Sequence, residues 1–210
     1  MTVDGKLAMP DGARLNISSE EDFERVHRLR NSCDAILVGI NTIIHDDPSL
    51  LVKERFVRSP RTPLRVVLDS KGRIPAKATV LDMRAKTLIA VTVGSEKKAQ
   101  TKVGSKHNVE VKGFGKGMVD LRKLLQHLVA RGVRTVMVEG GGETIWSFLR
   151  AGFVDELTIF VGNMVVGGKG PTMASGLGAK KMSDIVPLQL VSVQRMPGGV
   201  LLRYRPAKRP

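Results

Sequence analysis

The sequence predicts an α/β fold with a mostly parallel central sheet, flanking helices and a C-terminal antiparallel hairpin. Over most of the chain, short apolar runs alternate with segments of helical periodicity, which is the pattern of buried parallel strands joined by crossover helices. Near the C-terminal end, strand patterns follow one another with no long helix between the last two. A chain of 210 residues is long enough to bury a core of its own, so a single domain over residues 1–210 is expected.

The first expected helix covers residues 18–31 and is followed by buried strands. Ser18 and Glu21 have the spacing of an N-terminal capping box, and Phe23 opens an apolar stripe at helical spacing. Apolar runs that suit strands covered on both faces then occupy residues 34–40, 64–69 and 87–93.

From residue 95 the chain alternates helix and strand, and it then changes to strands alone. A helical stripe of leucines begins near Met118, and Gly132 stands where a helix C-cap belongs. Pro197-Gly198-Gly199 is typical of the turn of an antiparallel hairpin. The glycine-rich connection over residues 164–188 is a candidate binding segment, because loops without a function are seldom so long. The other elements are expected as helices at 95–103 and 143–152 and strands at 108–112, 133–139, 156–162, 188–194 and 200–204.

Composition narrows the range of partners. The chain carries 34 Lys and Arg against 20 Asp and Glu, a formal net charge of +14, so an anionic partner is expected. Aromatic residues are only 4% of the chain, which argues against surfaces that stack bases, and we expect no nucleic-acid partner. One cysteine and four scattered histidines lack the spacing of a metal site, so no metal is expected. With no long apolar run and no secretory signal pattern, the sequence predicts a cytoplasmic protein without a membrane partner.

Three consecutive glycines between an expected strand and an expected helix are the sharpest local signal in the chain. Gly140 to Gly142 place unhindered backbone N–H groups at the start of a helix that begins with Glu143 and Thr144, and such a turn binds phosphate. The same glycines equally fit a tight strand-to-helix turn that needs positive φ. Glu139, directly before them, either accepts hydrogen bonds from a ligand or meets solvent.

Polar loops also follow two other expected strands. Thr42 and the segment H-D-D-P-S-L at residues 45–50 come after the first strand, and Asp69 and Ser70 come after the second. The acids of the first loop either accept hydrogen bonds from a ligand or form an Asx-type turn in which Pro48 fixes φ. Because the carboxyl ends of parallel strands meet at one edge of a sheet, the three loops are expected to converge there.

These motifs, in their order and spacing, resemble the riboflavin-pathway reductase family over nearly the whole chain. The resemblance rests on V-H-R-L-R at 26–30, D-A-I-L-V-G-I-N-T-I-I-H-D-D-P-S-L at 34–50, P-L-R-V-V-L-D-S at 63–70, V-E-G-G-G-E-T-I-W at 138–146, V-D-E-L at 154–157 and G-G-K-G-P-T at 167–172. It implies a dihydrofolate-reductase-like fold and the NADPH-dependent reduction of a ribosylaminopyrimidine 5′-phosphate to its ribitylamino counterpart. The sugar opens, and its C1′ imine accepts the hydride.

The same resemblance assigns roles to individual residues. It implies that NADPH contacts Thr42, Asp46, Ser70, Gly141, Gly142, Glu143 and Thr144, and that the substrate contacts Arg30, Leu50, Lys53 and Glu139. The planar fork of Arg30 suits a phosphate. Glu139 and Asp46 are the nearest candidates for an acid or base.

The sequence departs from the family pattern in three places. Lys53 stands where many relatives have Arg, which keeps the charge but loses the bidentate geometry. Glu143 and Thr144 are shifted by one position relative to chains with Thr directly after the glycines. The apolar first strand that normally precedes residues 1–6 is missing, so we expect that Met1 is not the native start.

A chain with one cysteine lacks the H-x-E and P-C-x-x-C motifs of the zinc deaminase that is fused to this reductase in many bacteria. It is similar to the free-standing archaeal type, which implies reduction of 2,5-diamino-6-ribosylamino-4(3H)-pyrimidinone 5′-phosphate before deamination. Two alternatives stay open: the same reduction of the deaminated 5-amino-6-ribosylaminouracil 5′-phosphate, and a related NADPH reductase with another substrate. The resemblance also implies a homodimer.

Overall fold

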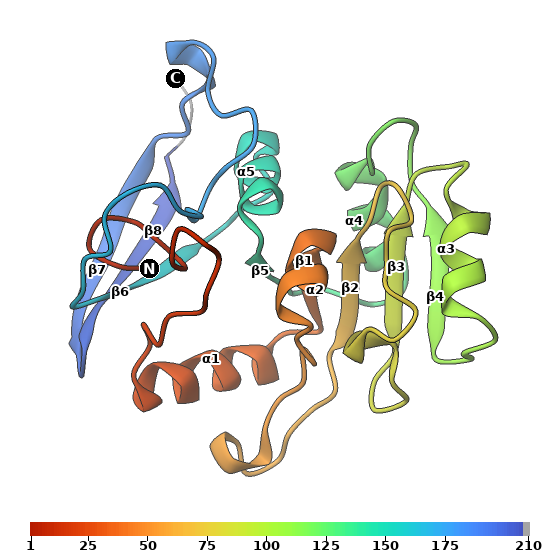
Figure 1. The fold of residues 1–210 in the computed structure, drawn as a ribbon, viewed down its shortest axis with the longest axis horizontal. Helices are drawn as coiled ribbons and strands as arrows, with labels where there is room; N and C mark the ends of the chain where they lie inside the picture. Colours follow the sequence, from red (N-terminus) through yellow and green to blue (C-terminus); the bar gives the residue numbers. More distant parts are fainter. Residues whose placement is uncertain (208–210) are drawn as a thin grey trace. The chain divides into compact units, whose positions relative to one another are not determined.

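The structure is a computed structural model that describes residues 1–207, and its chain forms two compact units. One unit comprises Val26–Gly141, and the other comprises Met1–Arg25 together with Gly142–Pro210. Helix α1 (Glu20–Ser32) runs from the second of these units into the first. Figure 1 shows the ribbon with its elements labelled.

The unit Val26–Gly141 holds a five-stranded parallel sheet, which confirms the expected central sheet. Within the described residues its strand order is β4-β3-β2-β1-β5, and every neighbouring pair is parallel. The apolar runs of β1 and β3 lie in its interior, and all five residues of each are buried. The elements of this unit are β1 (Ala35–Gly39), α2 (Ile40–Asp46), β2 (Leu64–Leu68), β3 (Thr87–Val91), α3 (Glu96–Val103), β4 (Val109–Gly113), α4 (Leu121–Ala130) and β5 (Val136–Gly140), with 3₁₀ turns η1 (Glu54–Phe56) and η2 (Thr79–Leu81).

The order of the strands creates a switch point beside β1. The chain starts at β1, moves outward through β2 and β3 to β4, and returns to the opposite side of β1 as β5. Loops that follow β1 and β5 therefore leave the same edge of the sheet in opposite directions, and such crevices are where open α/β sheets bind ligands.

Alternate residues of the strands supply the core on one face of the sheet. Ile36 and Val38 of β1 pack there with Val67 of β2 and with Ile89 and Val91 of β3, as the two-residue period of a strand requires. Helices α2 and α3 add Ile40, Ile43, Ala99 and Val103 to the same cluster. Both faces of β1 and β3 are buried, so every residue of these strands is covered. This is why their sequences are continuously apolar and do not alternate with polar residues.

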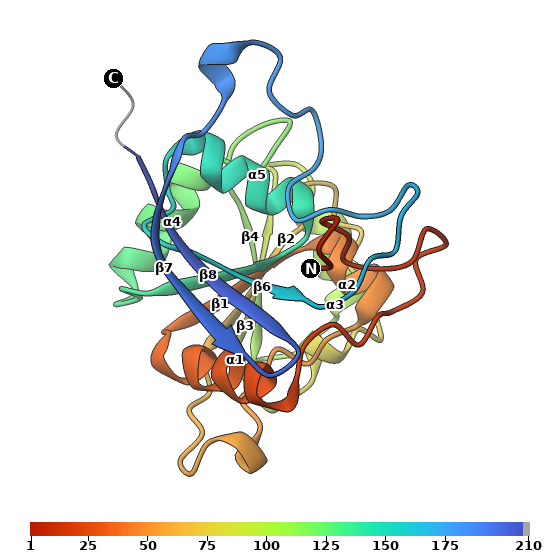
Figure 2. The same ribbon diagram turned by 90° about the vertical axis from the view of Figure 1, so that its left-hand side faces the viewer.

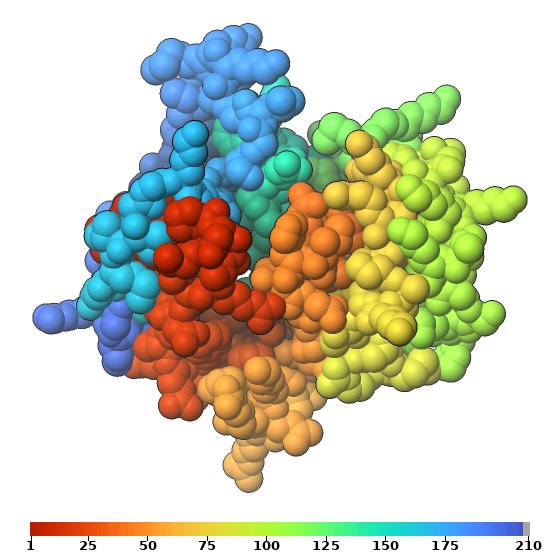
Figure 3. Space-filling model, viewed as in Figure 1, coloured from red at the N-terminus to blue at the C-terminus, as the bar shows by residue number. Residues whose placement is uncertain are grey.

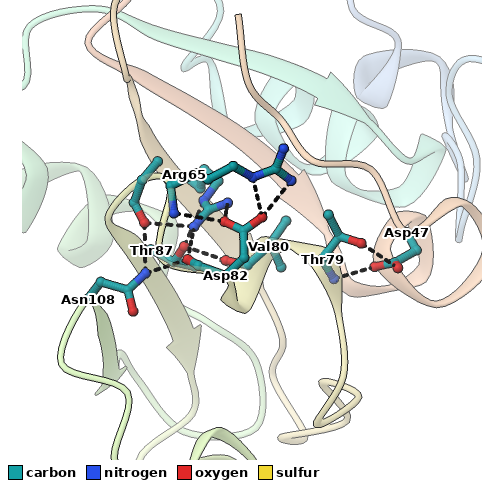
Figure 4. A network of polar contacts seen from close by, with 9 residues as sticks. Asp47, Arg65, Thr79, Val80, Asp82, Thr87 and Asn108 are labelled. Carbon is teal, nitrogen blue, oxygen red and sulfur yellow. Dashed lines mark hydrogen bonds and ion pairs between the residues drawn. The ribbon is translucent and has the colours of Figure 1, made fainter.

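A fully buried arginine fixes the connection between β2 and β3 (Figure 4). The Arg65 guanidinium donates to Asp82 Oδ1 at 2.9 Å, to Thr87 Oγ1 at 2.9 Å and to the backbone oxygens of Asp82 and Ala85 at 2.8 and 2.7 Å. Asn108 donates to the same two backbone oxygens. Burial lowers the pKa of the Arg65 guanidinium, and its hydrogen bonds with Asp82 oppose that shift. This network satisfies the backbone oxygens of Asp82 and Ala85 inside the unit, whereas Asn108 Oδ1 has no hydrogen-bond partner.

The other unit contains a three-stranded antiparallel sheet of order β6-β8-β7 within the described residues (Figure 2). The expected hairpin is present as β7 (Leu188–Met196) and β8 (Gly199–Pro206), and its hydrogen-bonded neighbour is β6 (Leu157–Gly162) rather than an edge strand of the parallel sheet. Phe160, Met196 and Leu201 form its core. The unit also contains α5 (Gly142–Ala151) and the 3₁₀ turn η3 (Met182–Asp184).

The capping box expected at the start of the first helix is wrong by one residue. Ser19 is the residue before α1, and its Oγ accepts from Asp22 N at 3.2 Å, while Ser18 Oγ donates to the Asp22 carboxylate at 2.5 Å. The expected apolar stripe also fails at its first position, because Phe23 is 46% exposed and Asp22 is buried instead. A buried carboxylate with two hydrogen-bond donors replaces the apolar contact that the periodicity predicts.

Among residues 1–207, no helix combines the length and the apolar character that crossing a bilayer requires.

Candidate functional site

The loops after β1 and β5 meet, as the three polar strand ends predict. A Cβ added to Gly141 would lie 3.3 Å from Thr42 Oγ1, so the hydroxyl on α2 faces the glycine turn directly. Gly140 has a φ of +152°, a backbone conformation that favours glycine. Because Gly141 has no side chain, its backbone lies close to the Thr42 hydroxyl, and a glycine turn beside a hydroxyl suits the approach of an anion.

Gly142 is explained by packing within its own unit. A Cβ at this position would lie 2.5 Å from Ser175 Oγ and 2.8 Å from the carbonyl oxygen of Thr172. Ser175 N also donates to the Gly142 carbonyl at 3.2 Å. The glycine-rich connection therefore lies against the first turn of α5, and the three glycines serve three different purposes.

This difference predicts opposite outcomes for two alanine substitutions. Gly142→Ala places a methyl group against backbone and is expected to lower the free energy of unfolding by about 2 kcal/mol, as overpacked sites do. Gly141→Ala meets only the end of the Thr42 side chain, so stability should change by less than about 1 kcal/mol while the Kd for NADPH rises about tenfold. Urea unfolding and cofactor fluorescence titration of both variants check this. Equal effects of the two substitutions on both quantities would contradict the assignment.

Glu139 is the extra residue of a β-bulge in β5. Leu37 of β1 pairs with Val138 and Val38 pairs with Gly140, so Glu139 lies between the two pairs. A bulge re-aims the side chain that it carries, and bulges are frequent next to functional sites. Here the bulge lies at the carboxyl end of β5, directly before Gly140.

The Glu139 side chain forms a bidentate ion pair with Arg30 of α1. Arg30 Nε donates to Glu139 Oε1 and Arg30 Nη2 donates to Glu139 Oε2, both at 2.6 Å. Arg30 Nη1 also donates to the Leu51 carbonyl at 3.2 Å. The pair is largely buried, with 15% and 14% of the two side chains exposed. The structure thus brings two of the predicted substrate residues together and directs the fork of Arg30 at a carboxylate.

Leu50 is buried as a whole residue. It is 1% exposed and packs in the core cluster with Ile43 and Val67, so neither its side chain nor its main chain is open to a ligand in this structure. Leu50 and Asp47 both have positive φ, at 53° and 41°, which is uncommon outside glycine. Two left-handed residues in one short loop fold the chain sharply at the edge of the sheet.

The adjacent acids of this loop have separate surroundings. Asp47 holds η2, because its carboxylate accepts from Thr79 N and from Thr79 Oγ1, both at 2.7 Å (Figure 4). These contacts join residues 32 positions apart, so they are not the local side chain–backbone bond of an Asx-type turn. Asp46 is exposed at the end of α2, one turn after Thr42.

Ser70 lies at the carboxyl end of β2 in a hydrogen-bonded loop. Its Oγ accepts from Val119 N at 3.2 Å and its carbonyl accepts from Thr92 Oγ1 at 2.7 Å. Three residues later, Arg73 Nη2 donates to Asn41 Oδ1 at 2.9 Å, so the loops after β1 and β2 meet as expected.

The residues after the glycines differ in exposure. Thr144 is buried, and Glu143 is exposed beside Gly176 of the glycine-rich connection. The negative side chain at the helix start therefore points to solvent.

Sequence patterns did not indicate His27, which the structure places beside this site. His27 is 3% exposed on α1, and its Nδ1 accepts from Lys53 N at 3.2 Å. Burial, followed by the charges of Arg30, Lys53 and Arg55, lowers the pKa of His27 from 6.5 to about 4. Its sequence signals are its place in the V-H-R-L-R motif at 26–30 and its spacing of three residues from Arg30.

The lowered pKa predicts a pH-dependent stability. Because unfolded His27 binds a proton at a higher pH than folded His27, the free energy of unfolding should fall as the pH decreases from 6.5 to about 4. The expected loss is up to about 2–3 kcal/mol relative to His27→Asn, which cannot titrate. Urea unfolding across this range checks the prediction, and identical pH profiles for the two proteins would contradict it.

A parallel sheet with polar loops at its switch point, a glycine turn beside a hydroxyl and a buried ion pair is the arrangement at which open α/β folds bind small ligands. Comparison with known proteins makes the class specific. The model of the family described as the RibD C-terminal domain matches residues 1–202, and the chain belongs to this family.

Two free-standing proteins with the same name match most of the chain. Both are called 2,5-diamino-6-ribosylamino-4(3H)-pyrimidinone 5′-phosphate reductase. The chain is 38% identical over 205 residues to the protein of Methanothermobacter thermautotrophicus, which covers 97% of this chain and 94% of the relative. It is 42% identical over 184 residues to that of Archaeoglobus fulgidus, with 83% of each chain covered.

The fold is shared with a solved bifunctional protein. The Thermotoga maritima structure titled diaminohydroxyphosphoribosylaminopyrimidine deaminase/5-amino-6-(5-phosphoribosylamino)uracil reductase superposes with a TM-score of 0.81 at 28% identity. The match covers 98% of this chain and 54% of that one, so the chain spans about half the length of the bifunctional protein. The expected family and fold are confirmed.

Proposed function

We propose that this chain reduces 2,5-diamino-6-ribosylamino-4(3H)-pyrimidinone 5′-phosphate to its ribitylamino product in riboflavin biosynthesis, with NADPH as the reductant. The observation that carries the proposal is the meeting of Thr42, Gly141 and the Arg30–Glu139 pair at the edge where β1 and β5 are neighbours. The two free-standing relatives, whose names state this reaction, support it because they match this chain almost from end to end.

The glycine turn fits the phosphate part of a nicotinamide cofactor. Only a hydrogen atom stands at Gly141 where a side chain would otherwise approach Thr42 Oγ1. Thr42 then offers a hydroxyl to a bound anion. Asp46, Ser70, Glu143 and Thr144 complete the proposed set. When bound, the cofactor supplies the hydride; the protein orients it and excludes competing contacts.

The Arg30–Glu139 pair is proposed to hold the substrate. Both Glu139 oxygens already accept from Arg30, and each retains a second lone pair for an amino or hydroxyl donor of the substrate. This geometry favours the role of Glu139 as an acceptor over the role of proton donor. Lys53, exposed before η1, offers its ammonium group to the 5′-phosphate. The resemblance also assigns Leu50 to the substrate, but Leu50 is 1% exposed and lies in the core.

The experiment compares two substrates at equal concentration. Purified protein is mixed with NADPH and either the diamino compound or the deaminated 5-amino-6-ribosylaminouracil 5′-phosphate, and consumption of reduced nicotinamide is followed. We expect a higher kcat/KM for the diamino compound. Faster turnover of the deaminated compound would replace the proposed substrate, and no turnover of either would refute the function. The resemblance also implies a cytoplasmic homodimer, which light scattering of the purified protein checks for its oligomeric state.

A further inference from the structure

Two side chains on one face of α1 hold a short extended segment of the chain in place. His27 and Arg30 are three residues apart, so they project from the same side of the helix. Arg30 Nη1 donates to the Leu51 carbonyl and His27 Nδ1 accepts from Lys53 N, both at 3.2 Å. Lys53 is extended, with φ −92° and ψ 129°. In an extended chain the carbonyl of one residue and the N–H two residues later point the same way, so the helix side chains take the place of a neighbouring strand.

An aromatic contact adds to these hydrogen bonds. The His27 ring stacks on Phe56 of η1, with centroids 4.9 Å apart and planes 16° from parallel. The Arg55 guanidinium lies 4.3 Å from the centroid of the same Phe56 ring. Residues around η1 project from the rest of their unit, as the orange segment of Figures 1 and 3 shows.

The side chain of His27 is neutral and lies among positively charged side chains. The charged groups that act on His27 are Arg30 from α1 and Lys53 and Arg55 from the held segment. Because Nδ1 accepts a hydrogen bond from a backbone N–H, the ring is in the tautomer with its proton on Nε2. A protonated ring would direct a second hydrogen at the Lys53 N–H, so the neutral form is required for the contact. Burial and the three cations favour this neutral form.

We propose that His27 is a positioning residue for the 5′-phosphate of the substrate: by fixing the backbone of Lys53 and the ring of Phe56, it places the ammonium of Lys53 for a phosphomonoester. The inference rests on the proposed function, in which Lys53 contacts the phosphate. His27 itself touches no ligand in this account. Its effect is to reduce the conformational freedom that Lys53 would otherwise lose on binding.

Two substitutions separate the hydrogen bond from the ring. In His27→Asn the side-chain oxygen replaces Nδ1 as an acceptor, and in His27→Phe the stacked ring is kept without the acceptor. We expect His27→Phe to raise the KM for the phosphorylated substrate about tenfold, as loss of one ordering hydrogen bond would, with kcat within about twofold. His27→Asn should stay within about threefold of the wild type. Phe23→Leu, an exposed change on the same helix, serves as the control.

A binding measurement keeps this inference separable from the reaction. Ribose 5-phosphate and ribose are titrated calorimetrically into the wild type and each variant. We expect His27→Phe to weaken ribose 5-phosphate binding about tenfold relative to His27→Asn. If the wild type binds this probe with that pattern but turns over no pyrimidine, the proposed function fails and the positioning role stands.

An unchanged KM and an unchanged affinity for ribose 5-phosphate in folded His27→Phe would overturn the proposal. If His27→Phe does not fold, His27→Gln replaces it, because its longer side chain cannot place an oxygen at the Nδ1 position. His27→Gln should then show the raised KM and weakened binding, and equality with His27→Asn would overturn the proposal in the same way. Thermal melts show whether His27→Phe is folded and therefore which of the two variants is used.

Discussion

Replacing Glu139 with Gln is expected to lower kcat/KM for the pyrimidine substrate about 100-fold, which corresponds to about 2.7 kcal/mol of lost transition-state stabilisation. The substitution removes the charge that pairs with Arg30 and directs an amide N–H₂ group at its fork. The partly buried Arg30 then lacks its charged partner, and a substrate donor loses a carboxylate acceptor. Steady-state kinetics at saturating NADPH measure the effect.

The Kd for NADPH should change less than about twofold in Glu139→Gln, because the glycine turn and Thr42 are left intact. Glu110→Gln on the edge strand β4, where Glu110 pairs with Arg131, is the matched control and should retain wild-type kinetics. A parallel loss of NADPH affinity and kcat/KM in Glu139→Gln would show that Glu139 acts on the whole site rather than on the substrate.

The substitution Arg65→Met should lower the free energy of unfolding by about 3–5 kcal/mol, the cost of breaking a buried charged network on one side. Arg65 is 0% exposed and donates to Asp82, Thr87 and Ala85. Methionine fills part of the space but removes the ion pair with Asp82 and leaves Asn108 as the remaining side-chain donor to the backbone oxygens of Asp82 and Ala85. Urea denaturation at neutral pH gives the value.

The same carboxylate supplies a matched control for Arg65→Met. Arg84 also pairs with Asp82, but its side chain is 59% exposed, so Arg84→Met should cost less than about 1 kcal/mol. The two arginines share one aspartate, but Arg65 is buried and also donates to Thr87 and Ala85, whereas Arg84 is largely exposed. Equal destabilisation by the two substitutions would contradict the importance assigned to the buried network.

The parallel strands could be predicted from the sequence because burial on both faces leaves a direct mark on composition. The runs at β1 and β3 are apolar throughout, and all of their residues are buried. The start of α1 shows the limit of such patterns. Ser18 and Ser19 both offer a hydroxyl that could cap the helix. Ser19 accepts from Asp22 N, because Ser18 is used to donate to the buried Asp22 carboxylate. A buried carboxylate is not indicated by the spacing of apolar residues.

The candidate site was predicted at the level of loops and not at the level of contacts. Strand ends indicated that Thr42 and the glycines would meet, because parallel strands place their carboxyl ends on one edge. The pairing of Arg30 with Glu139 joins residues 109 positions apart and depends on a bulge, which leaves no periodic signal. For the same reason His27 was not indicated, since its hydrogen bond with Lys53 forms only after α1 packs against the segment.

The proposed transfer of a hydride from NADPH to C1′ of the substrate can be tested by following the hydride itself. The protein is incubated with the diamino substrate and NADPH that carries deuterium at the transferable position of the nicotinamide, and the product is examined by mass spectrometry and NMR. This account predicts a ribitylamino product with deuterium at C1′. A product without deuterium at C1′, or no reduced product from folded protein, would contradict it.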